Sequence, residues 1–125
     1  MFMAALETIK LFQKQPEPRH FKVGDIIFED GHKGQHMYGI IEGTVELKVN
    51  GEVVETIEQG DVFGEGALVH HEGTRASTAI AKTDCTLAFI DKGRFLFAVQ
   101  ETPEFALEVL RSYSDRLRRL KRHEM

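Results

Sequence analysis

Two short stretches decide the fold assignment of this chain: FGEGAL at residues 63–68 and TRASTA at residues 74–79. They place a carboxylate, Glu65, and a guanidinium, Arg75, on either side of a glycine-rich turn. A carboxylate accepts a hydrogen bond from a hydroxyl group, and the planar arginine fork binds two phosphate oxygens. Glycines let backbone N–H groups approach an anion closely. The pattern therefore predicts a pocket for a ligand that carries both a sugar hydroxyl and a phosphate.

Around these stretches, the chain between residues 21 and 90 alternates apolar and polar positions, with turn residues every few places. Asn50-Gly51 is typical of a two-residue hairpin turn. Several short strands at regular spacing indicate an antiparallel sandwich or barrel. We expect strands at Phe21–Val23, Ile26–Phe28, Met37–Ile41, Thr44–Val49, Val53–Ile57, Ser77–Ala81 and Cys85–Asp91.

Helical periodicity precedes and follows the predicted strands. The spacing predicts one helix over residues 4–13 and two more over residues 92–100 and 103–122. The last helix carries an apolar seam with a heptad-like spacing of 4, 3, 4 and 3 residues. A seam of this kind can pack on the protein's own sheet, cover a pocket as a lid, or join two copies of the chain. Its members are Ala106, Leu110, Tyr113, Leu117 and Leu120.

In order and spacing, the two stretches resemble the phosphate-binding cassette of the cyclic nucleotide-binding domain family. That family includes the catabolite activator protein, the regulatory subunits of cyclic-AMP-dependent protein kinase and cyclic-nucleotide-gated channels. The likeness extends to Phe21–Gly31 and Met37–Leu47. It implies one mainly-β domain over residues 1–125, an eight-stranded jelly-roll β-roll (a double-stranded β-helix) with flanking helices. Its expected parts are an N-terminal helix and linker at 1–20, a β-roll at 21–91 that holds the cassette at 63–79, and two C-terminal helices at 92–122.

The resemblance implies that the ligand is a 3′,5′-cyclic nucleotide. Arg75 would then pair with the phosphate, backbone amides of residues 64–68 would donate to it, and Glu65 would bind the ribose 2′-hydroxyl. Ala76 stands where some relatives that prefer cyclic GMP (cGMP) have threonine, so the resemblance favours cyclic AMP (cAMP). The expected ligand-binding residues are Gly64, Glu65, Gly66, Ala67, Leu68, Arg75, Ala76 and Ser77, with Leu47 and Val62 as apolar walls.

Two departures from the family pattern concern the cassette itself. Gly66 replaces a larger apolar residue found in many relatives, and Gly73-Thr74 stands where a proline often precedes the arginine. Neither change removes a ligand-contacting group, but both leave the loop less rigid, which would lower affinity.

The resemblance also suggests how a signal would leave the domain. Relatives often join this module to a DNA-binding, kinase or channel domain, whereas here the sequence stops at Met125. We therefore expect a regulatory sensor that acts through an unknown protein partner or through a homodimer formed by the last helix. His123 aligns loosely with a base-contacting position of the catabolite activator protein. The two alternatives are a non-binding interaction module of the same fold and a cupin-like metalloprotein built on His32, His36 and Glu42.

Composition narrows the functional class further. The net charge is −4, but residues 111–122 hold six basic residues and one acidic one, which leaves the rest of the chain at −9. An acidic body argues against broad nucleic-acid binding. The single cysteine, Cys85, fits a reducing compartment, and neither a signal peptide nor a membrane-spanning stretch is evident, so the cytoplasm is expected. We find no nucleophile and base at informative spacing, and we expect neither enzymatic activity, nor a metal, nor a cofactor besides the nucleotide ligand.

Overall fold

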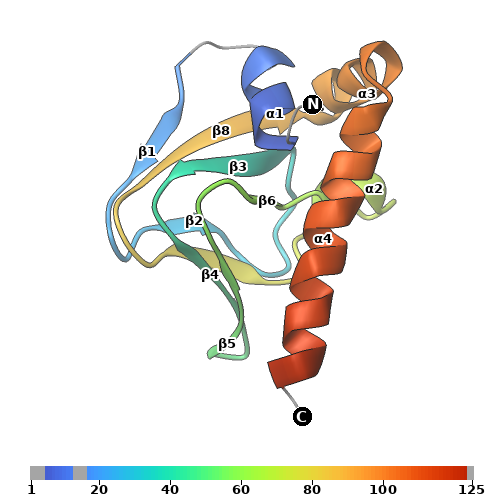
Figure 1. Ribbon diagram of the computed structural model, residues 1–125. Coiled ribbons are helices and arrows are strands. Elements are labelled where there is room, and N and C mark those ends of the chain that lie inside the picture. Colours follow the sequence, from blue (N-terminus) through green and yellow to red (C-terminus); the bar gives the residue numbers. More distant parts are fainter. Residues whose placement is uncertain (1–4, 13–16, 124–125) are drawn as a thin grey trace.

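The computed structural model describes residues 5–12 and 17–123 (Figure 1). Within them, eight antiparallel strands form two four-stranded sheets, with strand orders β1-β8-β3-β6 and β2-β7-β4-β5. This arrangement confirms the predicted β-roll. The strands are β1 (Arg19–Phe21), β2 (Ile26–Phe28), β3 (His36–Glu42), β4 (Val45–Val49), β5 (Glu52–Ile57), β6 (Val62–Phe63), β7 (Thr78–Ala81) and β8 (Cys85–Asp91).

The strand bounds differ from the prediction at the start of the roll. The first strand ends at Phe21 instead of beginning there, because Lys22 and Val23 leave the ladder for a turn. The amide of Lys22 donates to the Asp25 carboxylate at 2.8 Å, and the amide of Val23 donates to Asp84 Oδ1 at 2.9 Å. The hairpin between β4 and β5 forms as expected. Asn50 and Gly51 have φ of 53° and 80°, the left-handed pair that a type I′ turn requires.

Strand β8 shows how the sheets separate two cores. Leu87 and Phe89 point between the two sheets, whereas Ala88 and Ile90 point outward against the helices. Both faces of β8 are thus buried, which explains its nearly continuous apolar sequence. The core between the sheets includes Tyr38, Ile40, Val45, Leu47, Ile57 and Phe63, and the core under the helices includes Leu6, Ile9, Met37, Val62, Leu68, Ala98, Phe105 and Val109.

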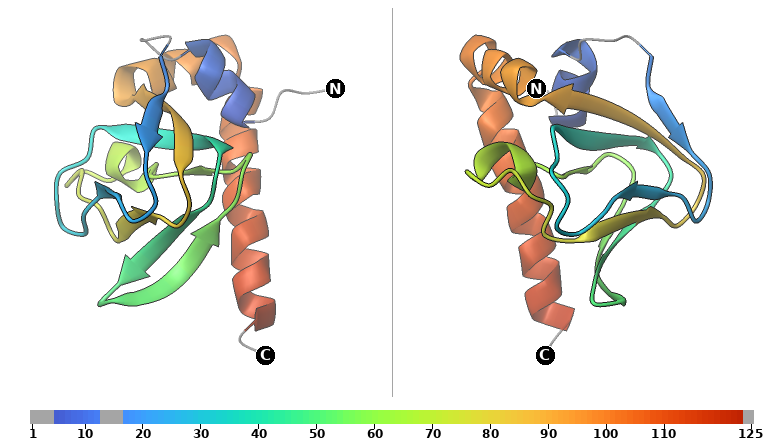
Figure 2. Two further views of the ribbon diagram at one scale, coloured as in Figure 1. Left: turned by 90° about the vertical axis from the view of Figure 1, so that its left-hand side faces the viewer. Right: turned by 180° about the vertical axis from the view of Figure 1, so that it is seen from behind.

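In the described part of the chain, four helices surround the roll: α1 (Ala5–Phe12), α2 (Gly66–Val69), α3 (Lys92–Glu101) and α4 (Glu104–His123). Figure 2 shows α1 and α3 together at one end of the roll, while α4 runs along its side and passes α2. Asp91 is the N-cap residue of α3, and its carboxylate accepts a hydrogen bond from the backbone amide of Arg94 at 2.8 Å. The outer residues of the helix predicted over 4–13 lie outside the described part of the chain, and so does the side chain of His123.

The apolar seam predicted on α4 packs against the roll only in part, because Tyr113 contacts the core under the helices whereas Leu110 and Leu117 do not. Leu110 and Leu117 are 63% and 53% exposed, whereas Phe105, Val109 and Arg116 are almost completely buried. Phe105 and Val109 fill the core under the helices and thereby fix the rotation of α4. Packing on the protein's own sheet is therefore the wrong interpretation for the two leucines, which face solvent.

Candidate functional site

A cavity of about 340 Å³ opens between the cassette, the sheet β2-β7-β4-β5 and the middle of α4. Eight of the ten predicted ligand-binding residues line it. Val62 and Leu68 do not, because both side chains turn into the core under the helices. The lining residues are Phe28, Leu47, Val49, Val54, Glu55, Gly64, Glu65, Gly66, Ala67, His70, Thr74, Arg75, Ala76, Ser77 and Tyr113.

Arg75 is buried in the wall of this cavity, with 5% of its surface exposed. Its Nη1 donates to the Gly64 carbonyl at 2.8 Å and its Nη2 to the His36 carbonyl at 2.7 Å. The guanidinium lies 4.0 Å above the Phe28 ring, and its Nε has no hydrogen-bond partner among the described residues. Burial lowers the pKa of Arg75 from its usual value, with the negative charge of Glu65 among the opposing influences. Arg75 is thus a fixed cation whose Nε–H has no hydrogen-bond partner in the described part of the chain.

The loop between β2 and β3 holds Arg75 in this position. The Arg75 amide donates to the His32 carbonyl, and the Gly31 amide donates to the Arg75 carbonyl, both at 2.8 Å. Gly34 lies directly against the guanidinium, since a Cβ at that position would collide with Nε of Arg75 and reach within 2.8 Å of the Ala67 Cβ. Only a residue without a side chain fits there while Arg75 keeps its place.

Glu65 begins the short helix α2 at the other side of the cavity. Its carbonyl accepts the amides of Leu68 at 2.8 Å and Val69 at 3.2 Å. The amide of Leu68 is therefore committed within the helix and is no donor for a ligand, contrary to the expectation for residues 64–68. The Glu65 carboxylate makes no capping hydrogen bond, and among the described residues it forms no ion pair with Arg75. The acidic and basic groups of the cassette face one cavity without neutralising each other by contact.

Two residues of α4 complete the site and were not among the predicted ligand-binding residues, although a lid over the pocket was one interpretation of the seam that contains Tyr113. Tyr113 lines the cavity, and its ring lies 4.0 Å from the Arg116 guanidinium. Arg116 pairs with Glu55 and donates to the Val62 carbonyl at 2.7 Å and to Ser112 Oγ at 2.9 Å. In the sequence, Tyr113 belonged to an apolar seam and Arg116 to a basic cluster, so neither pattern indicated a buried polar contact.

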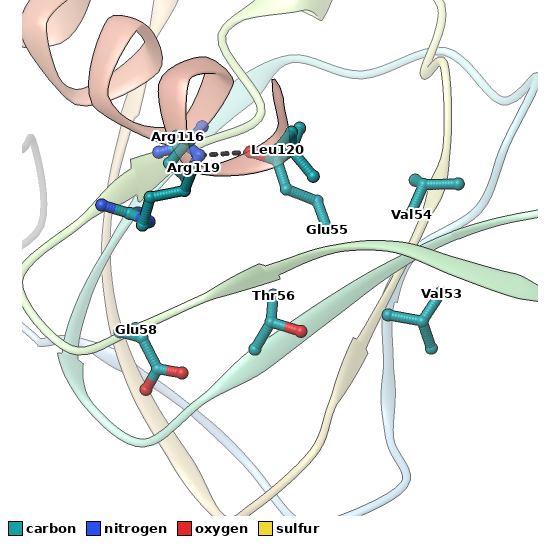
Figure 3. A pocket seen from close by; sticks show the side chains of 8 residues that line it. All are labelled: Val53, Val54, Glu55, Thr56, Glu58, Arg116, Arg119 and Leu120. Carbon is teal, nitrogen blue, oxygen red and sulfur yellow. Dashed lines mark hydrogen bonds and ion pairs between the residues drawn. The ribbon is translucent and has the colours of Figure 1, made fainter. Parts of the chain in front are cut away.

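A second, more open hollow of about 560 Å³ lies beside the first, between β5 and the last turns of α4 (Figure 3). Val54 and Glu55 contribute to both. Figure 3 shows the Arg116–Glu55 contact bridging from the helix to the strand at this place. Because only the smaller cavity contains the cassette, it is the candidate ligand site.

The histidines do not gather into a metal centre in the described part of the chain, where no group of three His, Cys, Asp or Glu side chains has a suitable arrangement. His32 instead lies 3.2 Å from Glu29 at the surface. Of the residues considered for a cupin-like site, His36 packs edge-on against Phe89. Across the same described residues, none of the helices combines the length and the apolarity needed to cross a bilayer.

Comparison with known proteins identifies the family. Residues 18–102 match the family model for the cyclic nucleotide-binding domain, so the chain belongs to that family, whose domain is a regulatory binding module. It is 32% identical over 95 residues to a cGMP-dependent protein kinase of Plasmodium berghei. It is 42% identical over 76 residues to a cAMP-dependent protein kinase regulatory subunit of Schizosaccharomyces pombe. These segments are 76% and 60% of this chain but only 11% and 18% of the two relatives, so the chain spans less than a fifth of either.

The solved structures give the same fold. The Thermus thermophilus catabolite activator protein superposes with a TM-score of 0.74 at 24% identity, over 95% of this chain and 56% of that one. At this identity the likeness establishes the fold alone. The predicted membership of the family is thereby confirmed by the family model, and the predicted β-roll by the structural match.

Proposed function

We propose that this chain binds a 3′,5′-cyclic nucleotide in the cassette cavity and prefers cAMP to cGMP. The observation that carries the proposal is the state of Arg75, a buried guanidinium that lines the cavity, forms no ion pair among the described residues and has an Nε–H without a hydrogen-bond partner there. Burying a cation without a counter-ion costs free energy, and a bound anion offsets that cost. A cyclic phosphodiester carries one negative charge and acceptor oxygens that fit this donor. No cofactor besides the nucleotide is part of the proposal.

The rest of the cavity matches the remaining parts of such a ligand. The first amides of α2, at Gly66 and Ala67, have no partner within the helix and supply neutral donors for the phosphate. The Glu65 carboxylate, which does not cap α2, lines the same cavity and can accept a hydrogen bond from the ribose 2′-hydroxyl. Leu47 and Val54 provide apolar surface for the flat base. Each chemical group of a cyclic nucleotide thus has a counterpart in one cavity.

The preference for cAMP rests on Ala76, which lies in the cavity wall next to Arg75. Its methyl group offers no hydroxyl to a guanine amino group. The relatives include a kinase named for cGMP and a regulatory subunit named for cAMP, so the family itself leaves the base open.

Isothermal titration calorimetry with cAMP, cGMP and 5′-AMP tests the proposal. We expect binding of both cyclic compounds, tighter for cAMP, and none of 5′-AMP at the same concentration. A thermal-unfolding series provides the second measurement, because a ligand at a hundred times its Kd stabilises the folded state by about 2.7 kcal/mol. Absence of binding by either cyclic nucleotide would overturn the proposal in favour of an interaction module.

Signal output would pass through α4, which contacts the cavity with Tyr113 and the β-roll with Arg116. A ligand that binds more tightly when α4 has one placement on the roll than when it has another shifts the equilibrium between the two placements. The size of the shift equals the difference in binding free energy. The exposed leucines of the seam, Leu110 and Leu117, would then contact a protein partner or a second copy of the chain. Size-exclusion chromatography of the purified chain with and without cAMP tests the second of these possibilities, because a homodimer elutes earlier than a monomer.

A further inference from the structure

His70 lines the cassette cavity, although it was not among the predicted ligand-binding residues. It follows the last residue of α2, where its amide donates to the Gly66 carbonyl at 3.0 Å and its carbonyl accepts the Gly73 amide at 3.1 Å. These two backbone bonds fix the position of His70 in the loop that leads to Arg75. Its imidazole ring forms no hydrogen bond or ion pair with another described residue. The backbone therefore presents to the cavity a ring whose nitrogens are not engaged by the protein.

Gly66 explains why the ring can occupy this place. Gly66 lines the same cavity, and a Cβ built on it would lie 3.7 Å from Cδ2 of His70, an ordinary contact. A side chain longer than a methyl group would therefore meet the ring. Gly66 is one of the two departures from the family pattern, which has a larger apolar residue at this position in many relatives. The structure gives this departure a consequence besides a looser loop, because it leaves space for the imidazole.

The chemistry of imidazole suits the phosphate of the ligand. A neutral imidazole has one N–H donor and a protonated one has two. Hydrogen bonds to an ionised acceptor are the stronger ones, and the phosphate is the anionic part of a cyclic nucleotide. Arg75 uses Nη1 and Nη2 for the carbonyls of Gly64 and His36, so the phosphate oxygens have lone pairs left for a further donor.

We propose that His70 is a ligand-binding residue that donates a ring N–H to a phosphate oxygen of the nucleotide, from the space that Gly66 leaves open. This inference rests on the proposed binding of a cyclic nucleotide. The side chain of His70 is exposed on its outer side, so the contact closes over the phosphate from the solvent side of the cavity. Stacking of the ring on the base is the other use of an aromatic side chain, and it is an outcome that the experiment can reveal.

The first experiment separates the donor from the ring. His70→Phe keeps a flat ring without an N–H, and His70→Gln keeps an N–H donor without a ring. We expect His70→Phe to weaken cAMP binding about 2- to 12-fold in calorimetry and His70→Gln to weaken it less. The loss in His70→Phe should be smaller for one of the Sp- and Rp-phosphorothioate analogues of cAMP, because sulfur is the weaker acceptor. His71→Phe is the matched control, since the next histidine of the loop is exposed and does not line the cavity.

The second experiment fills the space beside the ring. Gly66→Leu should displace the imidazole and weaken cAMP binding as much as His70→Ala, and the double variant should lose no more than either single one. Gly66→Ala is the control, because a methyl group makes only an ordinary contact with the ring and should leave the affinity unchanged. Gly66 does not have a positive φ, and glycine is a poor helix former, so both variants should keep or raise the melting temperature.

The outcomes separate the two proposals. If the unmodified chain binds neither cAMP nor cGMP, the proposed function fails and this inference falls with it. If the chain binds cAMP and His70→Phe binds it as tightly, the ring stacks or makes no contact, and the donor role is refuted. An equal loss of His70→Phe for cAMP and both phosphorothioates refutes the phosphate as the acceptor. Losses of Gly66→Leu and His70→Ala that add in the double variant show that Gly66 does not act through His70.

Discussion

The guanidinium of Arg116 on α4 forms an ion pair with the carboxylate of Glu55 on β5, at the boundary between the two hollows. Arg116 is 2% exposed and the Glu55 side chain 20% exposed. This contact joins the middle of the last helix to an edge strand of the sheet that forms the cavity wall. It therefore holds Tyr113, three residues earlier on the helix, against the cassette.

Removing the charge of Glu55 should destabilise the protein. In Glu55→Gln the buried guanidinium keeps its bonds to Val62 and Ser112 but loses its counter-ion. We expect the free energy of unfolding to fall by about 2–4 kcal/mol, measured by urea denaturation. Arg119→Ala is the control, because its 3.7 Å pair with Asp61 is largely exposed and should contribute less than about 1 kcal/mol. Equal effects of the two variants would contradict the role given to the Arg116–Glu55 pair.

Arg75 should dominate the affinity for the nucleotide. Arg75→Ala leaves the phosphate without its cation, and we expect binding to weaken by about 2–5 kcal/mol, roughly 30- to several-thousand-fold. Arg75→Lys should recover little, since an ammonium cannot keep the bonds to the Gly64 and His36 carbonyls and also face the cavity. Calorimetry with cAMP measures both, with Arg118→Ala on the exposed side of α4 as a charge-matched control. Unchanged affinity in Arg75→Ala would place the ligand elsewhere.

Gly34 should act on the ligand through Arg75. A methyl group at this position collides with the guanidinium and with Ala67, so we expect Gly34→Ala to weaken cAMP binding about tenfold or more. In an Arg75→Ala background the same substitution should have a smaller further effect, because only the close contact with Ala67 remains. Gly93→Ala controls for the loss of a glycine, since its Cβ would lie 3.6 Å from Asp91 Oδ1, an ordinary contact. A Gly34→Ala effect of the same size in both backgrounds would show that it does not act through Arg75.

The fold was largely predictable because its signals are local. Period-two alternation and the Asn50-Gly51 turn located most strands, and β6 was missed because a two-residue strand has no periodicity to detect. The rotation of α4 was not predictable in the same way. Its sequence carries an apolar seam through Leu110 and Leu117 and another apolar face through Phe105 and Val109, and only the tertiary packing selects which one is buried.

The site was predictable where the cassette motif specifies it and not beyond. Glu65 and Arg75 line one cavity, as their spacing indicated. Val62 was expected in that wall, but strand alternation gives a side chain two possible faces, and the neighbouring Phe63 takes the one toward the roll interior. Tyr113 and Gly34 contact the site from segments that are distant in sequence from the cassette, so no spacing within one motif could reveal them.

His36 should make stability depend on pH. Burial lowers the pKa of its imidazole below the ordinary value of 6.5, as do the charges of Arg19 and Arg75, while Asp91 opposes them. Protonation is therefore easier in the unfolded chain, so this contribution to stability is complete above pH 6.5 and is lost as the pH falls through the folded-state pKa. We expect urea denaturation to show a smaller loss of stability between pH 7.5 and pH 5.5 in His36→Gln than in the unmodified chain.

His71→Gln, in the exposed cassette loop, is the control for this prediction. This variant should lose as much stability between the two pH values as the unmodified chain does. Because the carbonyl of His36 accepts a bond from Arg75, cAMP affinity measured at both pH values shows whether the effect reaches the site.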